Sequence, residues 1–341
     1  MRRRTFLSAS LGSGLLGGLS ASSASRAPTM AADQKVAGGL KPYSDSGLAF
    51  GTTVSIQVLH DSEAAAQAAI RAALQEVRDI DALMSLHQVQ SQVHELNQRG
   101  VLISAHEHLR HVVDFAQQLS ILTAGAFDIT VQPLWLAFSR AAARGELPTP
   151  GEIAAAKSLV GWRRVEMDPL QLRLPTPGMA ITLNGVAQGY AVDLALKALR
   201  AHGVQHALLD TGEFGAVGHK ANGRAWQLGV GDPRRHDAIL ATLRLDGRMV
   251  ATSGDYETFF SPDFVHHHIF DPATGDSPPE LASVTVLAPT GILADGLSTA
   301  FMVMGASKSL ALASRIQDVD LLLIHKNGAV QKTARFPESI A

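Results

Sequence analysis

The sequence predicts an α+β fold in which mixed sheets pack against helices within a single large domain. Helical and strand patterns are mixed along the chain without the strict alternation that builds a doubly wound parallel sheet. The chain has 341 residues, 46% of them hydrophobic, so it can bury a large core. Length alone allows one large domain or two, and the sequence contains no internal repeat.

The composition excludes several classes of function. The formal net charge is −2 and charged residues make up 18% of the chain. The chain therefore has no excess of basic residues that would attract nucleic acid, and we expect no nucleic-acid partner. Cysteine is absent, which excludes disulfides, thiolate nucleophiles and cysteine-ligated metals. Any metal must therefore be bound through oxygen or nitrogen ligands.

The N-terminus has the features of an export signal. Residues 1–24 begin with three arginines, continue with a short apolar stretch and end in small residues, and the segment "RRTFL" fits the twin-arginine pattern of proteins exported already folded. A disordered basic leader is the alternative. We expect a soluble periplasmic protein, with residues 25–47 as a flexible leader and residues 48–341 as the folded domain.

Hydrophobic periodicity predicts the first elements of the domain. The segment "GTTVSIQV" alternates apolar and polar residues, as expected of a half-buried strand. A long amphipathic helix follows, capped by Asp61 or Ser62 and ending near Met84. A second helix is expected from about Glu107 to Thr123.

Strands dominate the second half of the chain. The segments "HALLD", "AWQLGVGD", "ILATLRLD", "RMVATSG" and "ASVTVLAP" have strand character. Helical runs are expected between Asp295 and Arg315. The segment "VDLLLIHKNGAV" predicts a late hairpin that turns at Asn327 and Gly328.

The segment "ITLNGVAQGYAVD", residues 181–193, is the first candidate for chemistry. Gly185 and Gly189 bracket a turn between the expected strand "AITL" and a helix that ends at Gly203, so amides at the helix start can favour an anion. The spacing matches neither a Rossmann nor a P-loop pattern. Taken alone, the segment is more typical of a tight strand-to-helix turn that binds nothing than of a ligand site.

Two further segments contain polar residues in unusual places. In "ADGLSTAFMVMG", Asp295 and Thr299 lie one turn apart at the start of an apolar helix, where they can supply oxygens to Mg²⁺, or Asp295 can simply cap the helix. In "VHHHIFDPATGDSP", three consecutive histidines precede a turn, and one of the three is a candidate acid-base group, whereas each alone is more typical of a surface loop.

Together these segments resemble one family, the ApbE-type FAD:protein FMN transferases, in order along nearly the whole mature chain. The matching pieces are "FGT" at the first strand, "DALMSLHQVQSQVHELN", "TAGAFDITVQPL", "NGVAQGYAVD", "VATSGDYETFF", "HHIFDPATG", "SVTVLAPT" and "ADGLSTA". Each piece is a weak signal alone, whereas eight in sequence are specific.

The resemblance implies an enzyme that binds FAD with Mg²⁺, moves FMN onto a Thr or Ser hydroxyl of an acceptor flavoprotein and releases AMP. By position, it implies an FAD site of Met84, Ala126, Phe127, Asp128, Thr182, Gln188 and Ser298. It implies a metal site of the Gly185 carbonyl, Asp295 and Thr299, and assigns proton removal from the acceptor to His268.

Some residues depart from the usual family pattern. Thr182 stands where many members have an acid, and Gln188 stands where many have Lys or Glu. The form "TLNGVAQGY" resembles the NosX-like branch, which implies a membrane-anchored acceptor that serves nitrous oxide reductase maturation. A periplasmic FAD-binding protein without transferase activity is the main alternative, and a periplasmic solute-binding protein is a second.

Overall fold

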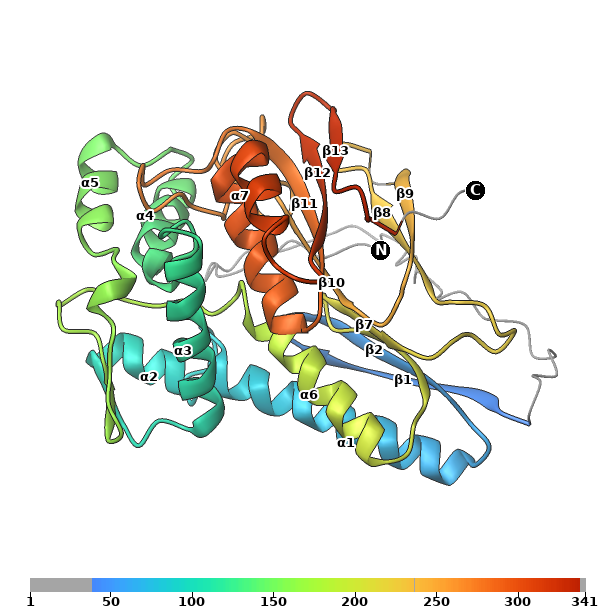
Figure 1. The fold of residues 1–341 in the computed structure, drawn as a ribbon. Helices are drawn as coiled ribbons and strands as arrows, with labels where there is room; N and C mark the ends of the chain where they lie inside the picture. The colour runs from blue at the N-terminus through green and yellow to red at the C-terminus, as the bar shows by residue number, and fades with distance from the viewer. Residues whose placement is uncertain (1–38, 236, 338–341) are drawn as a thin grey trace, which may run out of the picture.

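An antiparallel sheet of eight strands runs through the computed structural model, which describes residues 39–235 and 237–337 (Figure 1). All neighbouring strands are antiparallel, in the order β1-β2-β6-β7-β10-β11-β12-β13. The strands are β1 (Lys41–Ala49), β2 (Thr52–His60), β6 (His206–Asp210), β7 (Phe214–Val217), β10 (Met249–Gly254), β11 (Leu281–Ala288), β12 (Asp320–His325) and β13 (Val330–Lys332).

Strand β1 corrects the predicted leader, because Lys41–Ala49 is a strand paired with β2 along its full length. Most of its side chains are exposed, so the sequence shows no apolar alternation there, and backbone pairing with β2 makes the strand. The domain therefore starts at least seven residues before the predicted boundary of residue 48. The predicted export signal, residues 1–24, lies outside the described residues.

Three helices pack on one face of the large sheet (Figure 1). They are α1 (Glu63–Met84), α6 (Ala187–Ala201) and α7 (Gly291–Ala313). Helix α1 lies along α6, α6 contacts α7, and α7 lies against β10 and β11. Their buried faces join the sheet in the largest hydrophobic core of the described chain.

Several predicted boundaries are confirmed. The Ser62 hydroxyl accepts a hydrogen bond from the Ala65 amide at the start of α1, which ends at Met84. The late hairpin turns at Gly328, whose φ of 86° lies in the left-handed region that glycine adopts readily. Local signals, caps and turn glycines, were sufficient at these positions.

The segment between α1 and α6 forms a separate group of helices beside the sheet, seen at the left of Figure 1. It contains α2 (Gln92–Arg99), α3 (Glu107–Leu122), η1 (Ile129–Val131), α4 (Gln132–Ala142), α5 (Pro150–Ser158), η2 (Trp162–Arg164) and a small sheet of β3 (Val101–Ile103), β5 (Gln171–Arg173) and β4 (Glu166–Met167). The predicted second helix is thus confirmed as α3.

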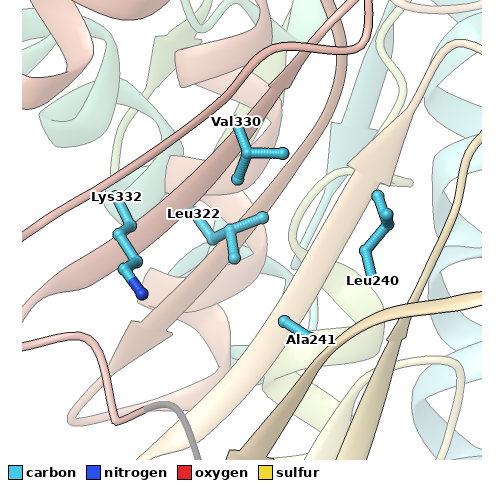
Figure 2. A pocket seen from close by; sticks show the side chains of 5 residues that line it. All are labelled: Leu240, Ala241, Leu322, Val330 and Lys332. Carbon is cyan, nitrogen blue, oxygen red and sulfur yellow. The ribbon is translucent and has the colours of Figure 1, made fainter.

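A second, smaller core joins the large sheet to the hairpin of β8 (Gln227–Gly231) and β9 (Ile239–Arg244). Between β9 and the β12–β13 pair lies a cavity of about 280 Å³, shown in Figure 2. Its lining residues are Leu240, Ala241, Leu322, Val330 and Lys332. None of them belongs to the predicted site.

Helix α7 confirms the helical runs expected after Asp295, but it begins four residues earlier, at Gly291, and is interrupted at Gly305. Among the described residues, it is the helix long and apolar enough to cross a membrane by length and composition. More than half of its most apolar stretch, 56%, is buried inside the protein. Packing against the sheet therefore accounts for its apolar character.

Candidate active site

The starts of α6 and α7 cross in very close contact, and this crossing organises the candidate site. A Cβ built on Gly189 would lie 2.1 Å from the Gly291 carbonyl oxygen, and one built on Gly291 would lie 2.2 Å from the Gly189 carbonyl oxygen. Only two glycines allow the backbones to approach this closely. The two predicted segments are therefore neighbours in space.

Asp295 links the two helices. Its side chain is 4% exposed, and Oδ2 accepts a hydrogen bond of 3.0 Å from the Gly189 amide in the first turn of α6. The cap of α7 itself is Asp193, whose carboxylate accepts bonds of 2.6 Å and 3.0 Å from the Gly291 and Ile292 amides. The interpretation of Asp295 as the cap of its own helix is therefore wrong, because Asp193 has that role.

Thr299 lies one turn after Asp295 and faces the other glycine of the predicted turn. A Cβ built on Gly185 would lie 2.9 Å from Thr299 Oγ1. The Ser253 hydroxyl, from β10, lies 2.7 Å from Ser298 Oγ and 3.2 Å from Thr299 Oγ1. The structure thus brings Gly185, Thr299 and Ser298 together with a hydroxyl from the sheet.

The chemistry of these groups fits a hard cation. One buried carboxylate, a hydroxyl and a backbone carbonyl are oxygen donors of the kind Mg²⁺ prefers, and Mg²⁺ usually takes only one or two carboxylates and completes its shell with waters and phosphates. Within residues 39–235 and 237–337, no group of three or more His, Asp or Glu side chains is arranged to hold a metal. An ion here would thus depend on a single carboxylate.

The predicted strand "AITL" is wrong. Residues 180–183 belong to neither a helix nor a strand. The Asn97 side chain holds this segment, since its Oδ1 accepts a bond from the Ile181 amide and its Nδ2 donates to the Ile181 carbonyl. The Thr182 amide donates to the Ile129 carbonyl at 2.8 Å. A side chain and a loop replace the expected ladder of strand hydrogen bonds.

The turn at the start of α6 does not offer all its amides to a ligand. The Val186 and Ala187 amides donate to the Leu183 carbonyl, and the Gly189 amide donates to Asp295. These three donors are already paired within the protein. A tight turn therefore describes this backbone better than an anion site built from helix-start amides.

The segment around Phe127 borders the same turn. The Phe127 ring edge lies 3.3 Å from a Cβ built on Gly185. The Asp128 carboxylate accepts bonds from the amides of Thr130 and Trp162, at 2.8 Å and 3.0 Å. Burial raises the pKa of the Asp128 carboxyl, and these hydrogen bonds partly offset that effect. Asp128 thus shapes the loop that places Phe127 at Gly185.

Three further residues of the predicted FAD site, Gln188, Met84 and Ala126, already have contacts within the protein. Gln188 Nε2 donates to the Thr211 carbonyl at 2.9 Å, which ties the start of α6 to the loop after β6. Met84 is buried in the main core at the end of α1, and the Ala126 amide donates to the Thr123 carbonyl. Their assignment to the FAD site stays a prediction.

The three consecutive histidines point in different directions. His266 Nδ1 lies 2.8 Å from Asp276, and the His267 ring is fully buried. His268 Nδ1 lies 3.1 Å from the Thr258 carbonyl oxygen. A carbonyl can only accept, so Nδ1 of His268 carries the hydrogen and the basic lone pair of the neutral ring is on Nε2.

Burial of His267 predicts a pH-dependent stability. The His267 side chain is 0% exposed, and this burial lowers its pKa from 6.5 to about 3. The nearby His268 and Lys326 lower the pKa further. Below pH 6.5 the unfolded chain binds a proton that the folded chain does not, so the free energy of unfolding falls as pH drops toward 3. We expect a loss of about 2 kcal/mol between pH 6 and pH 4.

Urea denaturation at several pH values tests this prediction. His267→Gln is expected to flatten the slope of stability against pH, while the exposed His87→Gln keeps the parental slope. Equal slopes in the parent and in His267→Gln would contradict it.

A second cavity, of about 350 Å³, lies behind the crossing of α6 and α7. It is lined by Tyr190, Asp193, Ile292 and neighbouring residues, and contains no predicted site residue. Asp193 was not predicted to have a role from the sequence. No local signal marks it, because its partners in α7 lie 98 and 99 positions away.

Comparison with known proteins places the chain in a family. The ApbE family matches residues 50–323. The FAD:protein FMN transferase of Haemophilus influenzae is 31% identical over 317 residues, which cover 86% of this chain and 90% of that protein. The transferase of the same name from Vibrio cholerae is 30% identical, with 85% and 89% covered.

Solved structures show the same fold. The crystal structure of an ApbE protein from Thermotoga maritima matches with a TM-score of 0.79 and 29% identity, covering 88% of this chain and 100% of that one. The apo form of the Pseudomonas stutzeri flavinyl transferase ApbE matches with a TM-score of 0.74 and 30% identity, covering 87% and 96%. These matches confirm the predicted α+β fold of mixed sheets packed with helices.

Proposed function

The chain belongs to the ApbE family and is an FAD:protein FMN transferase, and from this premise we propose that it moves FMN from FAD to a Thr or Ser hydroxyl of an acceptor flavoprotein. The observation that carries the proposal is the crossing of α6 and α7, which brings Gly185, Asp295 and Thr299 together. Oxygen donors concentrated at one point suit a reaction at a pyrophosphate.

The proposed reaction is a displacement at phosphorus. The acceptor hydroxyl oxygen forms a bond to the phosphorus of the FMN half of FAD, and the bond from that phosphorus to the bridging oxygen breaks. AMP leaves with the bridging oxygen, and the hydroxyl proton passes to a base. Such transfers depend mainly on positioning and charge neutralisation.

We assign the metal site to the Gly185 carbonyl, Asp295 and Thr299. When bound there, Mg²⁺ would neutralise charge on the phosphate oxygens. The chain's own contribution is to hold the carboxylate in place, because the Gly189 amide fixes Asp295 Oδ2 and the Ser253 hydroxyl fixes Thr299. The remaining proposed FAD residues are those implied by the family pattern.

We assign proton removal to His268. The bond from Nδ1 to the Thr258 carbonyl fixes the tautomer, so Nε2 has the lone pair that a base requires. The His268 amide also donates to the same carbonyl at 3.0 Å, which fixes the backbone at this residue. Both contacts orient the ring.

The proposed location is the periplasm, reached by the twin-arginine route. The segment "RRTFL" and the small residues that follow it support this proposal. Export as a folded protein suits an enzyme that acts on exported or membrane-bound acceptors. The form "TLNGVAQGY" supports assignment to the NosX-like branch, and with it an acceptor connected to nitrous oxide reductase maturation.

Mixing the protein with FAD, Mg²⁺ and a candidate acceptor flavoprotein tests the proposal. Mass spectrometry is expected to find FMN on a Thr or Ser of the acceptor, and chromatography is expected to find an equal amount of AMP. An FAD-binding protein without transferase activity would bind FAD but leave the acceptor unmodified.

Replacement of His268 by Gln is expected to lower the rate of FMN transfer by roughly 10²- to 10⁴-fold, the usual contribution of a general base. The part of the pH dependence of the transfer rate that comes from a general base should disappear in His268→Gln. Transfer rates measured across pH 5 to 9 provide the check. The neighbouring His266→Gln, which keeps a donor to Asp276, serves as the control and should retain the parental pH profile.

A further inference from the structure

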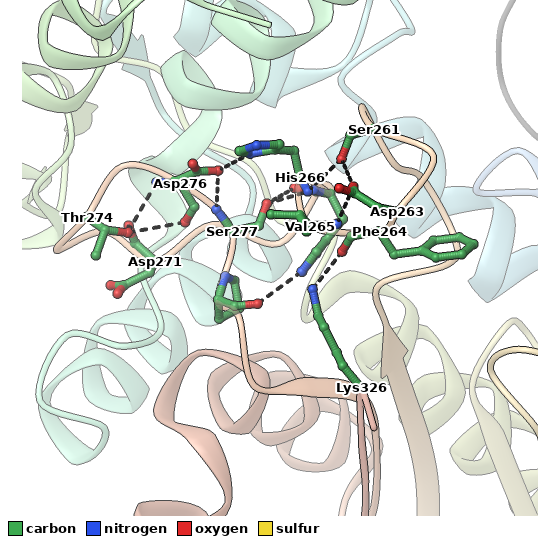
Figure 3. Close-up of polar contacts among 12 residues, drawn as sticks. Ser261, Asp263, Phe264, Val265, His266, Asp271, Thr274, Asp276, Ser277 and Lys326 are labelled. Carbon is green, nitrogen blue, oxygen red and sulfur yellow. Dashed lines mark hydrogen bonds and ion pairs between the residues drawn. The ribbon is translucent and has the colours of Figure 1, made fainter. Parts of the chain in front are cut away.

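The segment that contains His268 forms a small hairpin, shown in part in Figure 3. We call residues 258–268 the histidine hairpin. Phe259 and His267 form an antiparallel bridge, and the Phe260 amide donates to the His266 carbonyl at 2.7 Å. The hairpin begins at Thr258 and ends at His268, which are joined by the bond from the His268 amide to the Thr258 carbonyl.

Apolar packing anchors only the base of the histidine hairpin. Phe260 packs against Phe138 and Phe270, with ring centroids 5.4 Å and 6.2 Å away. Phe259, beside the base, is 45% exposed and meets the Phe264 ring edge-on, with centroids 4.8 Å apart, and Val265, next to the tip, is 44% exposed. Hydrophobic burial therefore contributes little at the tip, and other contacts must hold it.

Two cations hold the tip at Phe264. The Lys326 ammonium donates a 2.6 Å hydrogen bond to the Phe264 carbonyl, drawn as a dashed line in Figure 3. The Arg234 guanidinium lies over the Phe264 ring, 4.4 Å from its centroid. Phe264 itself has a φ of 59°, a conformation that a bulky residue keeps only where its surroundings impose it.

One buried carboxylate compensates both cations. Asp255 is 0% exposed and forms two bonds of 2.7 Å to the Arg234 guanidinium. The Lys326 ammonium lies 3.7 Å from the same carboxylate. A bidentate pair of this kind is geometrically specific, and a buried carboxylate requires such partners. Asp255 follows directly after β10, the strand that supplies Ser253 to the candidate metal site.

We propose that Asp255, Arg234 and Lys326 are positioning residues that clamp the tip of the histidine hairpin, so that His268 meets the acceptor hydroxyl in a fixed geometry. The inference rests on the proposed function of His268. The physical reason is that a base must lie within hydrogen-bond reach of its proton, and a shift of about 1 Å can lower a rate by as much as 10²-fold. The clamp connects the base to the same strand that supports the metal site.

Lys326→Met tests the clamp, because it removes the donor to Phe264 and keeps an apolar side chain of similar length. We expect kcat for FMN transfer to fall about tenfold or more, with the Kd for FAD unchanged, and Lys326→Arg to restore most of the rate. Hydrogen exchange of the amides in residues 258–268 should become about tenfold faster in Lys326→Met. The control is Lys332→Met on the neighbouring β13, where the side chain is exposed.

Hydrogen exchange separates failure of the clamp from failure of the proposed function. If the parent transfers no FMN, the proposed function fails, while exchange still decides whether Lys326 holds the hairpin. Parental exchange in Lys326→Met would overturn the clamp. So would a parental kcat in that variant, or the same loss of rate in Lys332→Met. Phe264→Leu provides a second variant, which removes the ring under Arg234 and should also speed exchange in the hairpin.

Discussion

Replacing Asp295 with Asn is expected to lower the rate of FMN transfer at limiting Mg²⁺ by about 10²-fold or more. Removal of groups that only orient a metal ligand typically costs 10- to 100-fold in metal affinity or activity, so loss of a charged ligand should cost at least as much. An Asn carbonyl can still accept the hydrogen bond from the Gly189 amide. The substitution therefore removes the charge while it preserves the contact between α6 and α7.

The measurement is the rate of acceptor flavinylation as a function of Mg²⁺ concentration. Asp193→Asn is the matched control, because Asp193 also accepts bonds from helix-start amides but is not among the proposed metal ligands. The control should keep the parental Mg²⁺ dependence. An unchanged Mg²⁺ dependence in Asp295→Asn would remove Asp295 from the metal site.

Gly189→Ala is expected to destabilise the protein by about 3 kcal/mol or more. Overpacking of a core usually costs about 1 to 3 kcal/mol, and here the added Cβ would lie 2.1 Å from the Gly291 carbonyl oxygen and 2.7 Å from Asp295 Cβ. Neither neighbour can rotate away, so the two helices must separate. The bond from the Gly189 amide to Asp295 should lengthen with them, and transfer activity should fall together with stability.

Helices intrinsically favour Ala over Gly, so a loss of stability in Gly189→Ala has to come from the close contact and not from helix propensity. In a helix interior, Ala is favoured over Gly by about 1 kcal/mol, so a helical glycine without close neighbours should be improved by the same change. Gly151→Ala in α5 is such a control, since its Cβ would meet only the Thr149 hydroxyl at 4.0 Å. Thermal unfolding of both variants gives the comparison. A Tm of Gly189→Ala equal to that of the parent would contradict the close crossing.

Much of the fold follows from local signals in the sequence. The cap at Ser62, the apolar face of α1 and the turn at Gly328 depend on a residue's own neighbours, and all three were predicted. The failures have a common cause. Strand β1 is formed by pairing with β2 and shows little apolar alternation of its own, and residues 180–183 are held by Asn97, 84 positions away from Ile181.

In the candidate site, too, the local part was predicted from the sequence and the long-range part was not. The spacing of Asp295 and Thr299 places both on one helix face, and this part was predicted from the sequence. The same spacing left two interpretations open, a metal ligand or a helix cap. The structure excluded the cap because Asp193 of α6 accepts the bonds from the first amides of α7, while Asp295 accepts a bond from α6.

The sequence by itself determined the family, the α+β class and the order of the segments that supply the site. Only the tertiary structure decided that Gly189 and Gly291 touch, that Ser253 reaches Thr299, and that Asp255 holds the cations at the tip of the histidine hairpin. The physical reason is the separation along the sequence of the residues that make each contact. Caps, turns and helix faces are set by residues within a few positions of one another, whereas these contacts join segments that only packing of the helices on the sheet brings together.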